Sequence, residues 1–423
     1  MPVSKFLLMS YIISLPFMRT PNMPFLGQKA QYSEIIFIIL FFYAIYKIIK
    51  EKMFLKIKIP FFLPLLFLAT TFFISLVFSK PGRKDFIEYL GIVYLALLYI
   101  LIIFLVRSKD EWYGYLKIWI WTSTFVCVLG ALGYLIASIS GKPNIIVPML
   151  NPQAKLALFP KVLQFQLRVC STFRNPNMLA SYLITSTVFI LLLIKKQIAG
   201  GKKNRGYIML LCLHVLAALL TKSRGAGGTF LLVTCGLFIF TNRKKYRPFK
   251  LFLSLFTIFY FLLALVTVVI WVFPIQLKPF KINTKNSEYF LQSEAGFKMW
   301  KDYPFFGIGL GRYNYNLLKY FDWNKGRESL PNPDDVSWRT KDPHSTYFGW
   351  LAETGLMGLS AILILLWVHI KTAMRIEDIN MIGVGIIAFL IAGFSMDILT
   401  LRYLWLLLGM NGAYTYISST EKI

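Results

Sequence analysis

The segment Asp342-Pro343-His344-Ser345-Thr346-Tyr347 ends a long polar stretch and is followed by an apolar run that contains Glu353. Histidine exchanges protons near neutral pH, so His344 is a candidate general base where a polar loop meets a membrane helix. The alternative is a helix cap or a headgroup contact without chemistry. A carboxylate inside a membrane helix is costly without a partner, so we expect an arginine or backbone amides to hold Glu353.

Arginines near expected helix starts suggest an anionic substrate. Arg168 and Arg174 precede Asn175-Pro176, a pair that predicts a helix start with Asn175 as the N-cap. Arg224 lies in a glycine-containing turn before another apolar run. Guanidinium groups bind phosphate through two parallel hydrogen bonds, and free N–H groups at a helix start favour anions. Contact with lipid headgroups is the alternative for these arginines.

Several other kinds of site are disfavoured. The chain has three histidines and four cysteines, with no C-x-x-C pair, no H-E-x-x-H sequence and no Walker sequence. The glycines from Gly307 to Gly311 follow no expected strand or βαβ unit, which argues against dinucleotide binding. We therefore expect no metal and no cofactor. His214 is expected to pack inside a membrane helix, and His369 to be solvated at the end of one.

Composition indicates a polytopic helical membrane protein. Of the 423 residues, 57% are hydrophobic and 15% are charged, whereas a soluble protein has about 25% charged residues. The net charge of +27 gathers largely in short loops at one set of helix ends, as membrane topology requires. No nucleic-acid-binding motif accompanies it, so the expected surroundings are a lipid bilayer and not DNA or RNA.

Hydropathy predicts about twelve spans. Their approximate cores are 3–18, 33–49, 61–79, 86–106, 113–139, 177–194, 206–221, 226–241, 250–273, 346–370, 380–396 and 400–418. Basic residues in alternate loops place the N-terminus in the cytoplasm. We expect one membrane domain over 1–423, with a large extracytoplasmic loop at 274–345 that carries part of the active site. Within that loop, helices are expected near 287–301 and 313–321.

Four segments share a pattern with a known family. They are Arg168-x-x-Ser171-Thr172-Phe173-x-Asn175-Pro176-Asn177, Ser223-Arg224-Gly225-Ala226, Pro304 to Gly311, and His344-Ser345 with Glu353-x-Gly355-x-x-Gly358. Together they resemble the O-antigen ligase and polymerase superfamily, which are bacterial membrane glycosyltransferases that use lipid-linked sugars. The resemblance covers roughly residues 165–360. Ser171 and Ser345 replace the usual glycine and asparagine, and Arg174 is additional.

The resemblance implies an all-α integral membrane protein, GT-C-like, with about twelve transmembrane helices and a long extracytoplasmic loop between helices 9 and 10. It implies a glycan donor on undecaprenyl pyrophosphate at the outer face of the bacterial inner (cytoplasmic) membrane, and a glycan or lipid-core acceptor. Arg168, Arg174 and Arg224 would bind the diphosphate. His344 and Glu353 are the catalytic candidates, His344 as the base and Glu353 as a residue that orients the site. One-step attack would invert the anomeric centre.

Two choices stay open at this level. A ligase moves a finished glycan to another molecule, whereas a polymerase adds it to another carrier-linked repeat, and both share these motifs. The alternative outside enzymes is a transporter or flippase of lipid-linked or small anionic substrates. Many transporters have two related halves, and no repeat relates residues 1–200 to 201–423, which favours the enzyme.

Overall fold

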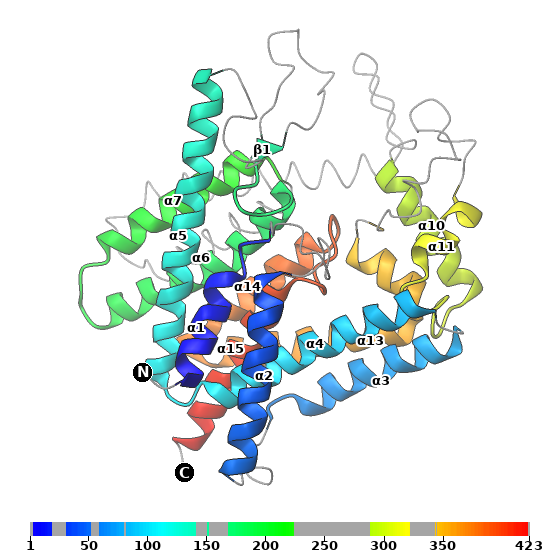
Figure 1. Ribbon diagram of the computed structural model, residues 1–423, viewed down its shortest axis with the longest axis horizontal. Coiled ribbons are helices and arrows are strands. Elements are labelled where there is room, and N and C mark those ends of the chain that lie inside the picture. The colour runs from blue at the N-terminus through cyan, green and yellow to red at the C-terminus, as the bar shows by residue number, and fades with distance from the viewer. Residues whose placement is uncertain are drawn as a thin grey trace.

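The computed structural model describes residues 3–18, 31–51, 59–79, 82–140, 150–151, 168–223, 288–321, 343 and 345–421. These residues are almost entirely helical (Figure 1). The helices are α1 (Val3–Ser14), α2 (Tyr32–Lys50), α3 (Phe62–Phe78), α4 (Arg83–Leu105), α5 (Lys109–Ser140), α6 (Pro176–Ala199), α7 (Arg205–Thr221), α10 (Glu288–Asp302), α11 (Tyr313–Tyr320), α13 (Thr346–Arg375), α14 (Asn380–Ala392) and α15 (Arg402–Thr420). A short 3-10 helix, η5 (Glu377–Ile379), precedes α14, and β1 (Leu150–Asn151) pairs antiparallel with β2 (Arg168–Val169).

The predicted spans coincide with helices wherever the structure describes them. Helices α1 to α7 and α13 to α15 each match one predicted apolar core. Five of the described helices, α2, α4, α5, α6 and α13, are long and apolar enough to cross a membrane. The predicted spans at 226–241 and 250–273 lie outside the described residues, so the total of about twelve stays a prediction. Helices α10 and α11 confirm the expected helical segments near 287–301 and 313–321.

Helix α6 forms the centre of the bundle. Every residue from 179 to 194 is buried, as expected for a helix that is apolar on all sides. Polar side chains of the neighbouring helices form hydrogen bonds to α6 and to one another. The indole of Trp119 on α5 donates to the Ser186 hydroxyl at 2.9 Å, and Trp112 donates to the Met410 carbonyl of α15 at 2.8 Å. Outward faces are apolar instead, with Phe42, Leu63 and Trp367 each more than half exposed, as lipid contact requires.

The two ends of the bundle differ in their contacts. At one end, α6, α13 and α15 begin and α3, α7 and α14 end; we call this the site end. Here Arg402 at the start of α15 pairs with Glu34 of α2. At the opposite end, Lys109 pairs with Glu421 at 2.6 Å, and Lys5 pairs with Glu111 at 3.4 Å. Successive helices therefore alternate in direction, as the predicted topology requires.

Of the two predictions made for histidines outside the active site, one is confirmed and one is wrong. His214 is buried, and its Nε2 lies 2.8 Å from the Ser123 hydroxyl, so the packed-core prediction is confirmed. The prediction that His369 is solvated is wrong, because it is 0% exposed. Its ring lies 4.4 Å from that of Phe61, and Asn411 of α15 donates to its Nδ1 at 3.0 Å. Helix α15 and Phe61, just before α3, cover the part of α13 that hydropathy places at the membrane surface.

Candidate active site

Helix α13 is interrupted at Gly355, within the motif that contains Glu353. The backbone there has φ 62° and ψ −162°, outside the helical region. The break removes the usual i to i+4 hydrogen bonds around it, since those bonds require continuous helical geometry. Backbone carbonyls before the break and amides after it must then find partners elsewhere.

Residues 304–312, which we call the glycine loop, supply those partners. The amides of Ile308 and Gly309 donate to the carbonyls of Ala352 at 2.8 Å and Glu353 at 3.0 Å. In the other direction, Leu356 donates to the Pro304 carbonyl at 2.9 Å, and Met357 donates to the Phe305 carbonyl at 3.1 Å. Two motifs that lie about 40 residues apart in the chain therefore form one backbone-bonded unit.

The glycines of this loop are required by its conformation. Gly307, Gly309 and Gly311 have φ values of 69°, 111° and 76°, which disfavour every residue with a side chain. A Cβ on Gly307 would lie 2.3 Å from the carbonyl carbon of Glu353, and one on Gly309 would lie 2.1 Å from the Cβ of Ser79. The glycines therefore allow the loop to pack closely against α13 and the end of α3. This is a packing role and not the role that glycines have in a dinucleotide site.

The side chain of Glu353 holds the same loop. Its Oε2 accepts from the Gly311 amide at 3.0 Å, and its Oε1 accepts from the Tyr313 amide at 3.1 Å. The Ser75 hydroxyl donates to the Glu353 carbonyl at 2.8 Å. Of the two partners that the sequence left open, backbone amides are the ones present. We therefore expect Glu353 to position the glycine loop.

An ion pair attaches the loop to α4 as well. The Arg312 Nε lies 3.2 Å from the Asp85 Oδ2, and Asp85 is 2% exposed. The same oxygen accepts from the Gly82 amide at 2.9 Å and so caps α4. Sequence reasoning missed this pair. An aspartate in the first turn of a helix is ordinary, and nothing in the local pattern connects it to an arginine 227 positions later.

Arg168 connects the end of α7 to the start of α6 at the site end. Its Nε donates to the Thr221 carbonyl at the end of α7 at 3.0 Å, and its Nη2 donates to the Asn177 side chain on α6 at 3.1 Å. The Ser223 hydroxyl donates to the same Asn177 oxygen at 2.9 Å. The Arg168 motif therefore adjoins Ser223, the residue before Arg224. Arg224 itself lies outside the described residues.

The surroundings of Arg168 are positively charged. Arg174 is exposed six residues further along the chain. Burial, and next the nearby charge of Arg168, lower the pKa of Lys222. Such a shift is expected where positive charges lie close together. An anion bound here would relieve that repulsion, which makes this cluster a candidate diphosphate site.

The segment between Arg168 and α6 contains Ser171 at the position where the resemblance predicts glycine. Ser171 has φ 47°, a left-handed conformation that favours glycine. Its hydroxyl donates to the Val126 carbonyl of α5 at 2.8 Å, which compensates part of the cost. The predicted cap is confirmed, since the Asn175 side chain accepts from the Met178 amide at 2.9 Å.

His344 lies outside the described residues, whereas the start of α13 directly after it is described. The next residues, Ser345 and Thr346, are buried. The Thr346 amide donates to the Gly393 carbonyl at 2.8 Å, and its hydroxyl donates to the Met396 carbonyl at 2.8 Å. These contacts fix the start of α13 against the segment between α14 and α15.

That segment leads directly into contacts with α6. Tyr403, in the first turn of α15, lies with its hydroxyl 2.5 Å from the Ser181 hydroxyl and donates to the Met178 carbonyl at 3.2 Å. The start of α13, beside His344, and the start of α6, beside Arg168, are therefore connected through α15. Within the described ranges, no group of His, Cys, Asp and Glu side chains is arranged to hold a metal ion.

Arg168→Lys is expected to reduce transfer activity by about tenfold or more, because one ammonium group cannot reproduce the forked contacts to Thr221 and Asn177. Losing charged hydrogen bonds at a partly exposed site should also lower stability by about 1–2 kcal/mol. Thermal unfolding of the purified protein and a transfer assay check both effects. Full activity with unchanged stability would show that charge alone suffices at this position.

Comparison with known proteins adds one match. Residues 207–363 match a family model described as O-antigen ligase. The matched region runs from α7 to the middle of α13 and includes the glycine loop, Glu353 and the break at Gly355. It begins after the Arg168 segment. None of the curated proteins compared with the chain matches it.

Proposed function

Because residues 207–363 place the chain in the O-antigen ligase and polymerase superfamily, we propose that it is a membrane glycosyltransferase that takes its glycan from undecaprenyl pyrophosphate. The glycan would pass to the hydroxyl group of a glycan or lipid-core acceptor. The backbone hydrogen bonds between the glycine loop and α13 are the observation that supports this proposal most strongly. They bring together two motifs of the matched region at the site end.

The arginines would bind the diphosphate of the donor. Arg168 and Ser223, the residue before Arg224, both bond the Asn177 side chain, and Arg174 is exposed six residues after Arg168. In the transfer step, the bond between the anomeric carbon and the diphosphate oxygen breaks, and the oxygen leaves with the electron pair. Guanidinium groups stabilise the charge that develops on this leaving group. This is the role that would make a metal ion unnecessary.

His344 would act on the acceptor. It removes the proton from the acceptor hydroxyl while that oxygen forms a bond to the anomeric carbon. Attack in one step from the face opposite the leaving diphosphate inverts the anomeric centre. The buried start of α13 holds the residues next to His344 in place, and Glu353 fixes the glycine loop two turns further along the same helix.

The protein would work as a multi-pass protein of the bacterial inner membrane, with the site end facing the periplasm or the cell exterior. Basic residues at the opposite end of the bundle support this orientation, because cytoplasmic loops are enriched in lysine and arginine. They include Lys47, Lys50, Lys195, Lys196, Lys202, Lys203 and Arg205. The loop at 274–345 of this single membrane domain would carry part of the site. Within the described residues, it contains α10, the glycine loop and α11.

His344→Ala is expected to abolish transfer while leaving the amount of protein in the membrane unchanged. The test compares carrier-linked and surface glycans on gels from cells that lack the protein and are complemented with wild type, His344→Ala or the adjacent control Ser345→Ala. The Ser345 hydroxyl makes a long hydrogen bond of 3.4 Å to the Gly393 carbonyl, so this control should keep most of the activity.

The same gels separate the remaining possibilities. Accumulation of single repeats without the protein indicates a polymerase, whereas accumulation of full-length chains on the carrier indicates a ligase. Full rescue by His344→Ala would contradict its role as the base. In that case, transfer and translocation would be measured separately in vesicles, since a flippase moves carrier-linked glycan without forming a new glycosidic bond.

A further inference from the structure

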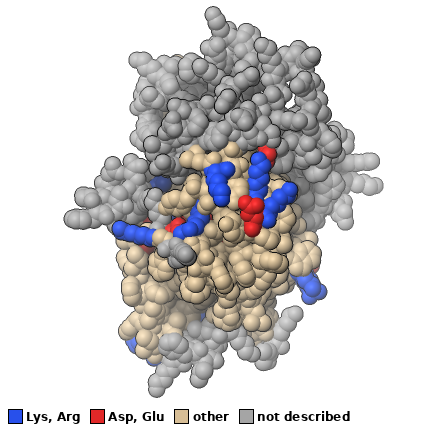
Figure 2. All heavy atoms as spheres, turned by 90° about the vertical axis from the view of Figure 1, so that its right-hand side faces the viewer, with Lys and Arg blue, Asp and Glu red and all other residues tan. Residues whose placement is uncertain are grey.

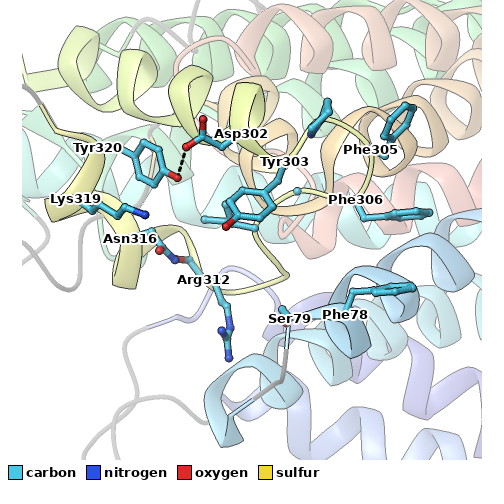
Figure 3. A pocket seen from close by; sticks show the side chains of 13 residues that line it. Phe78, Ser79, Asp302, Tyr303, Phe305, Phe306, Arg312, Asn316, Lys319 and Tyr320 are labelled. Carbon is cyan, nitrogen blue, oxygen red and sulfur yellow. Dashed lines mark hydrogen bonds between the residues drawn. The ribbon is translucent and has the colours of Figure 1, made fainter.

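A cleft of about 540 Å³ lies between the end of α3 and the segment formed by α10, the glycine loop and α11 (Figure 3). This volume is within the range of small-ligand sites. Its lining combines aromatic rings with charged and amide side chains. Those that carry the argument are Phe78, Asp302, Tyr303, Phe306, Arg312 and Tyr320.

One wall of the cleft is aromatic and lies where a membrane helix ends. Phe78 is the last residue of the apolar helix α3 and is 76% exposed. Its ring stacks on that of Phe306, with centroids 5.8 Å apart and planes 14° apart. Tyr303 is 52% exposed beside them. The cleft therefore lies at the level where the headgroup of a lipid-linked molecule leaves the apolar layer.

The other wall offers both hydrogen-bond donors and acceptors. The Tyr320 hydroxyl donates to the Asp302 carboxylate at 2.6 Å. Burial, followed by this contact with Asp302, raises the pKa of Tyr320 to about 12, so the phenol keeps its proton at neutral pH. Arg312 and Lys319 also line the cleft, and the Arg312 guanidinium points away from Asp302 and Tyr320 (Figure 3).

We propose that this cleft binds a saccharide unit of the acceptor. A sugar ring has an apolar face of C–H groups, which suits an exposed tyrosine or phenylalanine ring, and hydroxyl groups that both donate and accept hydrogen bonds. Asp302 accepts from such hydroxyls, whereas it repels a phosphate group. A ligand recognised by its phosphate alone would leave that carboxylate unfavourably placed.

The assignment to the acceptor rests on the proposed function and on position. The candidate diphosphate site lies on α6 and α7, whereas the cleft lies on α3, α10 and α11, and Figure 1 shows these two groups of helices on different sides of the bundle. The face that carries α10 and α11 has basic and acidic side chains together above a surface without charged residues (Figure 2). Mixed charge of this kind suits a hydroxyl-rich ligand better than a purely anionic one.

Tyr303→Ala tests the cleft directly. The protein is purified in lipid nanodiscs, and binding is measured with the repeat-unit oligosaccharide released from the host's own surface polysaccharide. Removing the exposed ring is expected to weaken binding by about tenfold, whereas Tyr303→Phe keeps the ring and should bind like wild type. Tyr315→Ala is the matched control, since Tyr315 is also exposed on this segment but does not line the cleft.

A second probe, glycerol phosphate, tests whether the cleft is an anion site instead. The proposal predicts that glycerol phosphate does not compete with the oligosaccharide and that Asp302→Asn weakens oligosaccharide binding. Competition by glycerol phosphate that becomes stronger in Asp302→Asn would overturn it, as would equal oligosaccharide binding by Tyr303→Ala and wild type.

Kinetics separate this proposal from the proposed function. In a transfer assay, Tyr303→Ala should raise the KM for the acceptor about tenfold and leave the KM for the donor unchanged. An unchanged acceptor KM in an active enzyme overturns the subsite alone. If wild type binds the oligosaccharide as expected but transfers nothing, the saccharide site stands and the proposed transferase activity fails.

Discussion

Gly355→Ala is expected to abolish activity by separating the glycine loop from α13. The conformation at Gly355, φ 62° and ψ −162°, belongs to a region that only glycine adopts readily, so a side chain alone costs about 1–3 kcal/mol. An added Cβ would also lie 2.3 Å from the Phe305 carbonyl oxygen and 2.7 Å from the Gly307 amide nitrogen. Both are backbone atoms and cannot rotate away, so the loop itself must move.

The measurement combines transfer activity with limited proteolysis of the loop in purified protein. Gly355→Ala should be inactive and cleaved faster within residues 304–312. Gly114→Ala is the control, because Gly114 is also a glycine within a membrane helix but a Cβ there would meet nothing within 4 Å. It should keep full activity and be slightly more stable. Wild-type activity in Gly355→Ala would contradict the proposed dependence of the site on this break.

Glu353→Ala is expected to reduce activity by about a hundredfold, the size of effect that a misplaced active-site segment produces. The change leaves the Gly311 and Tyr313 amides without their carboxylate partners, at a cost of about 1–3 kcal/mol for each buried donor. Glu353→Gln keeps one acceptor oxygen and replaces the other by an NH₂ group. It should therefore keep part of the activity, with a loss of about tenfold.

The glutamine variant distinguishes positioning from proton transfer. If Glu353 positions the loop, the pH profile of Glu353→Gln keeps the shape of the wild-type profile at a lower level. If Glu353 exchanges a proton in the reaction, one limb of the profile disappears and glutamine is as poor as alanine. Glu51→Gln is the control, since Glu51 pairs with Lys47 at the opposite end of the bundle. It should change activity little.

The site motifs were recognisable in the sequence, yet their arrangement was not. The sequence identified Glu353 as a carboxylate that needs a partner but could not choose between an arginine and backbone amides. The choice depends on how the glycine loop turns, and three positive φ angles at Gly307, Gly309 and Gly311 bring the Gly311 and Tyr313 amides to the carboxylate. The hydropathy pattern of a sequence gives no information about such φ angles. The Asp85–Arg312 pair escaped detection because its two residues lie 227 positions apart.

The sequence by itself determined that the chain is helical and membrane-embedded, where the described helices lie, and that Asn175 caps α6. Those features depend on local properties, namely apolar runs and the residues that end them. Only the tertiary structure decided that α13 breaks at Gly355, that Arg168 joins α6 to α7, and that His369 is buried. Each depends on backbone groups or side chains from distant segments, and hydropathy contains no information about which distant segments meet.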